Sequence, residues 1–225
     1  MAIPFRGSIK GVMKAKALLS TILLAAALVA PAGCASAPPA VNLSTTWPSA
    51  PSDYKAAHER WTRRDTIHQG LDHVLSVAAT ALSADFRAAY VAEKTRRLEL
   101  SDEERTSMTA AEKTADTDTV EFEVLFSTNR PDWNDLAKYP RTMWRVALVG
   151  DDGRVVLPSK IVPDKRVRAE VEEWFPDLGA FYKPYIVTFP RVAADGKPIL
   201  GDGSKQMKLE IACAFGRTEL VWAAP

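Results

Sequence analysis

The chain has 225 residues, of which 47% are hydrophobic and 25% are charged. These fractions are those of ordinary globular proteins, so they exclude collagen-like, low-complexity and wholly disordered chains. The 29 basic and 28 acidic residues leave a formal charge of +1, which argues against nucleic acid as the main partner, and two cysteines are too few for a disulfide scaffold.

The N-terminal segment has the pattern of an export signal. Residues 1–33 contain basic but no acidic side chains, and residues 17–30 are uncharged. A helix over that uncharged stretch would be about 21 Å long, which is shorter than the roughly 30 Å hydrocarbon core of a bilayer. A basic segment, a short apolar segment and small residues after it predict a signal peptide. Either Met1 or Met13 can be its start, because Lys14 and Lys16 alone make a compact basic segment.

The next four residues, Pro31-Ala32-Gly33-Cys34, resemble the lipobox of bacterial lipoproteins, in which small residues precede an invariant cysteine. Pro31 departs from the pattern, which usually has an aliphatic residue there. The resemblance implies that residues 1–33 are removed and that Cys34 becomes an N-terminus carrying palmitate or similar acyl chains, a stable anchor. It also implies an outer-membrane protein facing the periplasm or the cell surface. The alternative is cleavage after Ala32, which releases a soluble periplasmic protein.

Two segments follow in the mature chain. Residues 35–52 are rich in Pro, Ala and Ser and carry no charge, so residues 34–52 are predicted to be a lipidated cysteine followed by a disordered tether. Residues 53–225 are numerous enough for one hydrophobic core. We expect a single globular α+β domain there.

The first part of this domain has mixed periodicity. Residues 67–82 suit either a buried strand or a helix, and we favour a strand that joins the later sheet. Ser83 stands where an N-cap belongs, before a stripe of small apolar residues at helical spacing. Ser101-Asp-Glu-Glu104 matches a capping box that begins a second helix. The two helices are predicted to be an insertion between strands.

From about residue 118 the hydrophobic period is two, which is typical of strands with one buried face. Gly150-Asp-Asp-Gly153 predicts a hairpin turn, and Val167–Trp174 a short helix that ends before Pro176. The pattern predicts an antiparallel β-sandwich-like core with the helical pair inserted. The residues expected to be buried in it are Val120, Phe122, Val124, Phe126, Trp144, Val146, Leu148, Val187, Leu209, Ile211 and Leu220.

A search for chemistry gives no catalytic residue, no metal site and no cofactor. His68 and His73 are five residues apart, which suits a chelating pair neither on one helix nor on one strand. The loop from Gly196 to Gly201 has the glycine spacing of a phosphate-binding loop but lacks its lysine. Cys213 alternates with polar residues in a predicted strand, so we interpret it as a buried, inert thiol. Basic clusters such as Lys165-Arg166 are interpreted as solvated surface.

Aromatic residues gather in two predicted loops, residues 130–141 and 174–185. They either plug the open ends of the sandwich or form a partner surface, since Trp, Tyr and Arg are enriched at binding hot spots. The candidate surface, with its polar rim, consists of Trp133, Tyr139, Phe181, Tyr182, Arg130 and Lys183.

These observations favour an envelope lipoprotein with a non-catalytic binding or assembly role, whose partners are the membrane and other envelope proteins, and not nucleic acid. The alternative is an envelope hydrolase or transferase. An enzyme needs a cleft with an acid or base poised by its surroundings, and the acids beside the aromatic loops are Asp132, Asp135 and Asp177.

Overall fold

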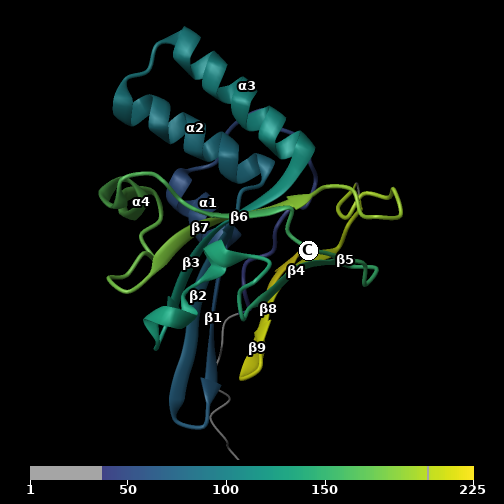
Figure 1. The fold of residues 1–225 in the computed structure, drawn as a ribbon. Helices are drawn as coiled ribbons and strands as arrows, with labels where there is room; N and C mark the ends of the chain where they lie inside the picture. Colours follow the sequence, from purple (N-terminus) through teal and green to yellow (C-terminus); the bar gives the residue numbers. More distant parts are fainter. Residues whose placement is uncertain (1–36, 202) are drawn as a thin grey trace, which may run out of the picture. The chain divides into compact units, whose positions relative to one another are not determined.

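The computed structural model describes residues 37–201 and 203–225 and has the α+β fold expected from the sequence, with a sandwich-like core of antiparallel sheets (Figure 1). One sheet has the order β1-β2-β3-β7-β6, and its strands, in that order, are Thr62–Gln69, Asp72–Ala81, Thr119–Thr128, Lys183–Pro190 and Lys160–Pro163. The other has the order β5-β4-β8-β9, with strands Val155–Val156, Arg145–Gly150, Gln206–Cys213 and Gly216–Ala223.

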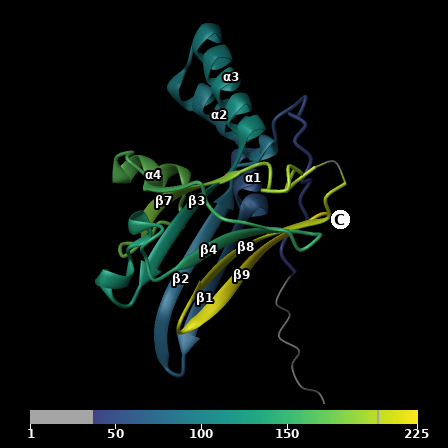
Figure 2. The same ribbon diagram turned by 45° about the vertical axis from the view of Figure 1, so that its right-hand side comes forward.

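The two sheets lie against each other along β1 and β9 (Figures 1 and 2). At this edge Arg63 Nε donates to Val221 O at 2.6 Å. A Cβ atom on Gly216 would lie only 2.7 Å from Cγ2 of Ile67, so the close approach of the strands requires glycine there. All the residues that the sequence places in the core are buried, which confirms the predicted inner face of each strand.

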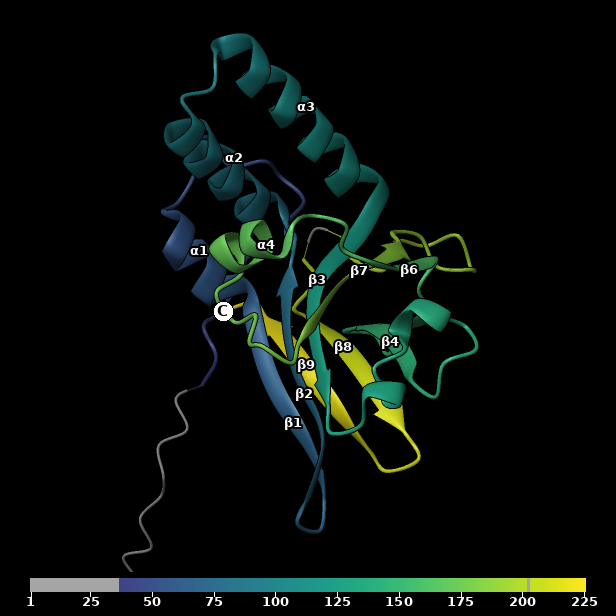
Figure 3. The ribbon, with the colours of Figure 1, turned by 60° about the vertical axis from the view of Figure 1, so that its left-hand side comes forward.

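Strand β3 differs from the prediction on its second face. The alternation of the sequence indicates one buried face, yet Glu123 is 0% exposed and Leu125 is 2% exposed. Helices α1 (Tyr54–Trp61) and α4 (Arg168–Trp174), together with the segment that follows β6, lie at the end of the sheet where β3 begins (Figure 3). A carboxylate on the supposedly solvated face is therefore enclosed.

The predicted helical insertion is confirmed. Helices α2 (Ala84–Leu98) and α3 (Asp102–Asp118) connect β2 to β3. Ser83 accepts a hydrogen bond from the N–H of Phe86 at 3.2 Å, and Ser101 and Glu104 form both bonds of the capping box. Only Asp116 of α3 is buried, so α3 projects from the sheets, whereas the first half of α2 is buried (Figures 2 and 3).

Residues 67–82 form strands, as favoured, but they belong to two of them. Gly70, with φ of 61°, makes the turn between β1 and β2. This hairpin places His68 opposite His73, with ring centroids 5.6 Å apart. The five-residue spacing did not predict this pair, because it was evaluated for one continuous helix or strand, whereas His68 and His73 lie on two paired strands.

The prediction of a disordered tether over residues 35–52 is wrong for most of its length. Val41 and Leu43 are buried, and the N–H of Val41 donates to the carbonyl of Ala223 at 2.9 Å. The compact unit is Pro38–Pro225, so it begins before residue 53. Val41 and Leu43 therefore pack this extended segment against the rest of the domain.

The predicted signal peptide, the two possible start residues and Cys34 lie outside the described residues. Within residues 37–201 and 203–225, no helix is both long enough and apolar enough to span a bilayer.

Candidate functional site

The aromatic residues expected to form a partner surface have divergent surroundings. The Trp133 ring stacks on Phe215 with centroids 4.8 Å apart, and the Arg130 guanidinium lies 5.0 Å from the Trp133 ring centre. The Trp133 carbonyl also accepts a hydrogen bond from the indole of Trp144 at 2.6 Å. Trp133 therefore behaves as a plug at an open end of the sandwich.

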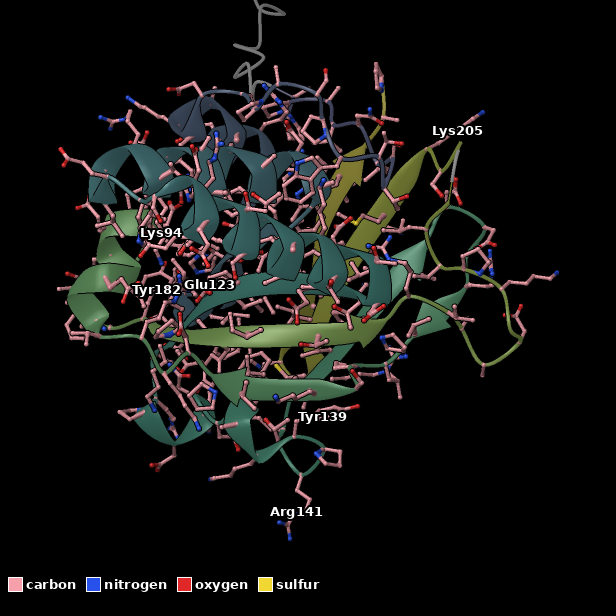
Figure 4. The ribbon with its side chains drawn as sticks, turned by 90° about the horizontal axis from the view of Figure 1, so that it is seen from above. Lys94, Glu123, Tyr139, Arg141, Tyr182 and Lys205 are labelled. Atoms are coloured by element: carbon pink, nitrogen blue, oxygen red, sulfur yellow. The ribbon has the colours of Figure 1, made fainter. Side chains whose placement is uncertain are left out.

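The two candidate aromatic residues of the second loop differ in their exposure to solvent. Phe181 is 85% exposed, whereas Tyr182 is half-buried beside Gly179. The two loops meet through Lys183, whose Nζ donates to the Asn134 carbonyl at 3.2 Å. Figure 4 shows Tyr139 and Tyr182 at separate places, so the six candidate residues do not make one contiguous patch.

Two of the three acidic residues considered as candidates for an enzyme accept hydrogen bonds from neighbouring side chains. Asp177 accepts two hydrogen bonds from the Arg64 guanidinium, at 2.5 and 2.8 Å. Asp135 accepts one from the Thr142 hydroxyl. Asp132 is exposed. Asp132 and Asp135 line a hollow of about 470 Å³ and Asp177 lines one of about 320 Å³, but none of the three carboxyl groups is fully buried.

The described part of the chain contains no cluster of three or more His, Cys, Asp or Glu side chains that could hold a metal ion. His58 is buried, and burial lowers its pKa. Cys213 is half-buried instead of fully buried, and its sulfur accepts the N–H of Phe215 at 3.4 Å.

The feature with the most distinctive chemistry is a hollow of about 340 Å³ between the α2–α3 hairpin and the outer face of β3 and β7. Its apolar lining comes from Leu82, Phe86, Tyr90, Phe175 and Ile186, and its charged lining from Arg87, Glu112, Glu121, Glu123, Asp164 and Arg166. Figure 4 shows Glu123 in the interior of the domain, close to where α2 and α4 lie. This volume falls within the usual range for small-molecule sites, about 300–1,000 Å³.

The base of the hollow is an ion-pair network. Arg166 Nη2 donates to Glu123 Oε2 at 2.7 Å, and Arg166 Nε donates to Asp164 Oδ2 at 2.7 Å. The guanidinium also lies over Phe175, 5.2 Å from the ring centre. The second oxygen of Glu123, Oε1, is buried and has no hydrogen-bond partner among the described residues. An unsatisfied buried oxygen of this kind is costly, by about 1–3 kcal/mol.

A second network forms the wall toward the helices. Arg87 donates to Glu112 and, at 2.8 Å, to Glu121 Oε2, while its Nε donates to the Leu82 carbonyl at 2.7 Å. The other oxygen of Glu121 accepts from the Thr188 hydroxyl at 3.1 Å. Each Glu121 oxygen and each nitrogen of the Arg87 guanidinium thus makes a hydrogen bond, and Glu123 Oε1 is a buried acceptor without a partner among the described residues, between the two networks.

Burial raises the pKa of Glu123 to about 8, against the opposing effect of Arg166. The neighbouring carboxyl of Asp164 adds to the rise. A carboxyl group with its pKa raised in this way holds its proton to a higher pH than an exposed one, in a range useful for binding or for proton transfer.

Aromatic packing keeps the hollow open. The Phe86 ring stacks with Phe175 at 6.1 Å, and Tyr90 meets Trp174 edge-on at 4.9 Å. Tyr54 contacts both clusters, because its ring lies 5.7 Å from Phe86 and its hydroxyl donates to the Trp174 carbonyl. These rings brace α1, α2 and α4 against one another, so the polar residues of the hollow are held by rigid neighbours.

Sequence reasoning missed this site. Glu123 was one of the polar residues of an alternating strand, and Arg166 belonged to a basic cluster interpreted as solvated. The available signal was the inserted helical pair, because helices that leave β2 and return into β3 lie next to the first residues of β3. That insertion could have directed attention to Glu121 and Glu123.

Comparison with known proteins assigns no family. No protein-family model matches the chain, and no curated protein matches it. One solved structure that resembles it is a protein of unknown function from Burkholderia pseudomallei, at 14% identity over 75% of this chain and 80% of that chain, with a TM-score of 0.35. A resemblance this weak assigns neither fold nor function.

Proposed function

We propose that this protein is a lipid-anchored lipoprotein of the bacterial envelope whose folded unit is a non-catalytic binding module, with the hollow above Glu123 as its ligand site. One observation carries the binding function: a fully buried carboxyl group lines the hollow with an oxygen that no described residue satisfies. A ligand that donates a hydrogen bond to that oxygen would remove the cost of leaving it unpaired.

The location in the envelope is supported by the sequence alone. A basic segment, an apolar stretch and the lipobox-like residues before Cys34 are the features of an acylated export product. The compact unit begins at Pro38, four residues after Cys34. Four extended residues span at most about 14 Å. An acylated Cys34 would therefore hold the unit close to the membrane surface, with no long tether between them.

Metabolic labelling tests the anchor. Radiolabelled palmitate is expected to enter the wild-type protein and not Cys34→Ala, which would then accumulate as an unprocessed or soluble form. If neither chain takes up label and both partition equally, the protein is a soluble periplasmic one and the anchor is wrong. The ligand site would be unaffected by that result.

A second candidate function, an envelope hydrolase or transferase, is favoured by one observation. The pKa of Glu123, about 8, is that of a group able to give up or take a proton at neutral pH in a cleft. Binding is the better supported function, because the Glu123 carboxyl is already held by Arg166 and Arg87 already donates to two other carboxylates. Mass spectrometry of a bound compound after prolonged incubation separates the two functions, since an enzyme converts it and a binding module returns it unchanged.

The assembly role concerns the exposed Phe181. An aromatic side chain that is 85% exposed in a loop is a good anchor for a protein partner. Crosslinking in intact cells is expected to join this protein to another envelope protein, and Phe181→Ala is expected to reduce the yield. Leu71→Ala, at the tip of the β1–β2 hairpin, is a matched control. Equal yields for both variants would remove Phe181 from the proposal.

A further inference from the structure

The charge balance of the hollow indicates the sign of its ligand. Four carboxyl groups, from Glu112, Glu121, Glu123 and Asp164, face two guanidinium groups. Both guanidinium groups already donate to these carboxyl groups. An anion would therefore meet an excess of negative charge, so the lining disfavours it.

The apolar wall indicates the body of the ligand. Phe86, Tyr90 and Phe175 contribute aromatic rings, and Leu82 and Ile186 contribute aliphatic surface. Aromatic faces attract cations through their quadrupole, and they cover apolar groups at the same time. A volume of about 340 Å³ corresponds to roughly ten water molecules at about 30 Å³ each, which suits an organic molecule of about that many heavy atoms.

A bare divalent cation fits less well. Such ions take about six or more oxygen ligands, whereas the Glu121 oxygens and the inward oxygens of Asp164 are already bonded within the protein. Glu123 Oε1 is a buried carboxyl oxygen without a partner among the described residues, and it suits a single directed donor instead. An ammonium N–H supplies that donor together with a compensating charge.

Building on the binding function proposed above, we infer that the hollow takes a small organic cation, an ammonium group on an apolar or aromatic body, with the ammonium bonded to Glu123 Oε1. The body lies against Phe86, Tyr90 and Phe175. Arg166 holds the other Glu123 oxygen and so fixes the direction in which Oε1 points.

The inference has a pH signature. An ammonium group binds best when Glu123 is ionised, so binding releases the proton that the buried carboxyl holds below a pKa of about 8. The charged and titratable groups around it are Arg166 and Asp164 after β6, Tyr54 on α1, Arg87 and Tyr90 on α2, Glu112 on α3, and Glu121 on β3. Affinity is therefore expected to rise with pH, by at most about tenfold per pH unit, until Glu123 is ionised.

Three probes with one body test the inference: 2-phenylethylammonium, 2-phenylethanol and phenylacetate, measured by equilibrium dialysis with the full chain. We expect the ammonium probe to bind at least tenfold more tightly than the other two. Glu123→Gln should weaken it at least tenfold and abolish the rise with pH. Glu173→Gln, an exposed carboxylate on α4, is the matched control and should leave binding unchanged.

A second variant covers the possibility that Glu123→Gln does not fold. Ile186 is the register partner of Glu123 on β7 and lines the hollow. Ile186→Trp should fill the hollow and block the ammonium probe without changing a charge. Equal binding of the three probes, or binding that neither variant weakens, would overturn the cation inference.

The two proposals fail separately. A wider set of neutral and anionic compounds, tested on the wild type and on Ile186→Trp, shows whether anything binds in the hollow. If a neutral compound binds there and the ammonium probe does not, the ligand class is wrong and the binding function stands. If nothing in either set binds, both are wrong.

Discussion

One strand of this protein faces two different environments. On its inner side β3 carries Val120, Phe122, Val124 and Phe126, which pack between the sheets against rings such as Trp222, 5.2 Å from Phe122. On its outer side the same strand carries Glu121 and Glu123, which belong to the ion-pair networks of the hollow. Both sides are enclosed, but only the inner side is apolar. The inner face holds the fold together, and the outer face maintains a costly polar site that needs a functional explanation.

The largest expected effect is on the inner face. Phe122→Ala should lower the free energy of unfolding by about 3–5 kcal/mol, because it removes a fully buried ring and leaves a cavity between the sheets. Urea denaturation measures this. Phe181→Ala removes the same ring from an 85% exposed position and should change stability little. Similar losses for both variants would contradict the two-sheet core.

The next effect separates the two faces by pH. The pKa of Glu123 is raised to about 8 from an ordinary value of 4.5, so the folded state keeps a proton that the unfolded chain has already lost. Stability should therefore fall as pH rises through this window, by at most about 1.4 kcal/mol per pH unit from this group.

Comparing the wild type with Glu123→Gln isolates that contribution, since the other carboxyl groups are common to both chains. The stability difference between pH 5 and pH 7 should be up to about 2–3 kcal/mol larger in the wild type. Urea midpoints at the two pH values measure it. Parallel pH profiles for the two chains would show that the Glu123 pKa is not raised in the folded state. The claim that the outer face carries an energetically costly carboxyl group would then be wrong.

A smaller effect concerns the arginine of the outer network. Arg166→Met should destabilise the protein by about 1–3 kcal/mol, because it leaves oxygens of Glu123 and Asp164 without their donor. The loss should be greater at pH 9, above the pKa of Glu123, than at pH 6, where the buried carboxyl keeps its proton. Arg96→Met, at an exposed pair on α2, is the control and should cost less than about 1 kcal/mol. A loss independent of pH would mean that Arg166 acts through packing alone.

The inner face could be predicted from the sequence, and the outer face could not. Alternation of Val120, Phe122, Val124 and Phe126 is a local pattern, and so are the caps at Ser83 and Ser101, which is why the structure confirms them. Burial of Glu123 depends on segments more than forty residues further along the chain, such as Asp164 and Arg166. No local periodicity reports that.

Two further misses had different causes. Helix α1 did have a local signal, since Tyr54, Ala57 and Trp61 follow helical spacing after the N-cap Asp53. The docked strip at Val41 and Leu43 had almost none, because two isolated apolar residues in a Pro- and Ala-rich segment resemble a linker. For the site, the aromatic loops drew attention to a surface, whereas the rings that matter, Phe86 and Phe175, line a hollow braced by their own stacking.

The smallest effect concerns the α2–α3 helical hairpin, which borders the hollow on the outer face. Ser101→Ala removes the capping box of α3, in which Ser101 and Glu104 satisfy each other's backbone N–H groups, and such caps contribute about 1 kcal/mol. Because only Asp116 of α3 is buried, this loss should act locally and not on the sheets. Hydrogen exchange of the α3 amides is expected to speed up about fivefold, while β3 and β8 keep their protection. Ser107→Ala, at an exposed position inside the same helix, leaves the capping box intact and should not speed exchange. If β3 loses protection together with α3, the hairpin and the inner core unfold as one unit, and the wall that carries Arg87 and Glu112 is as rigid as the core it covers.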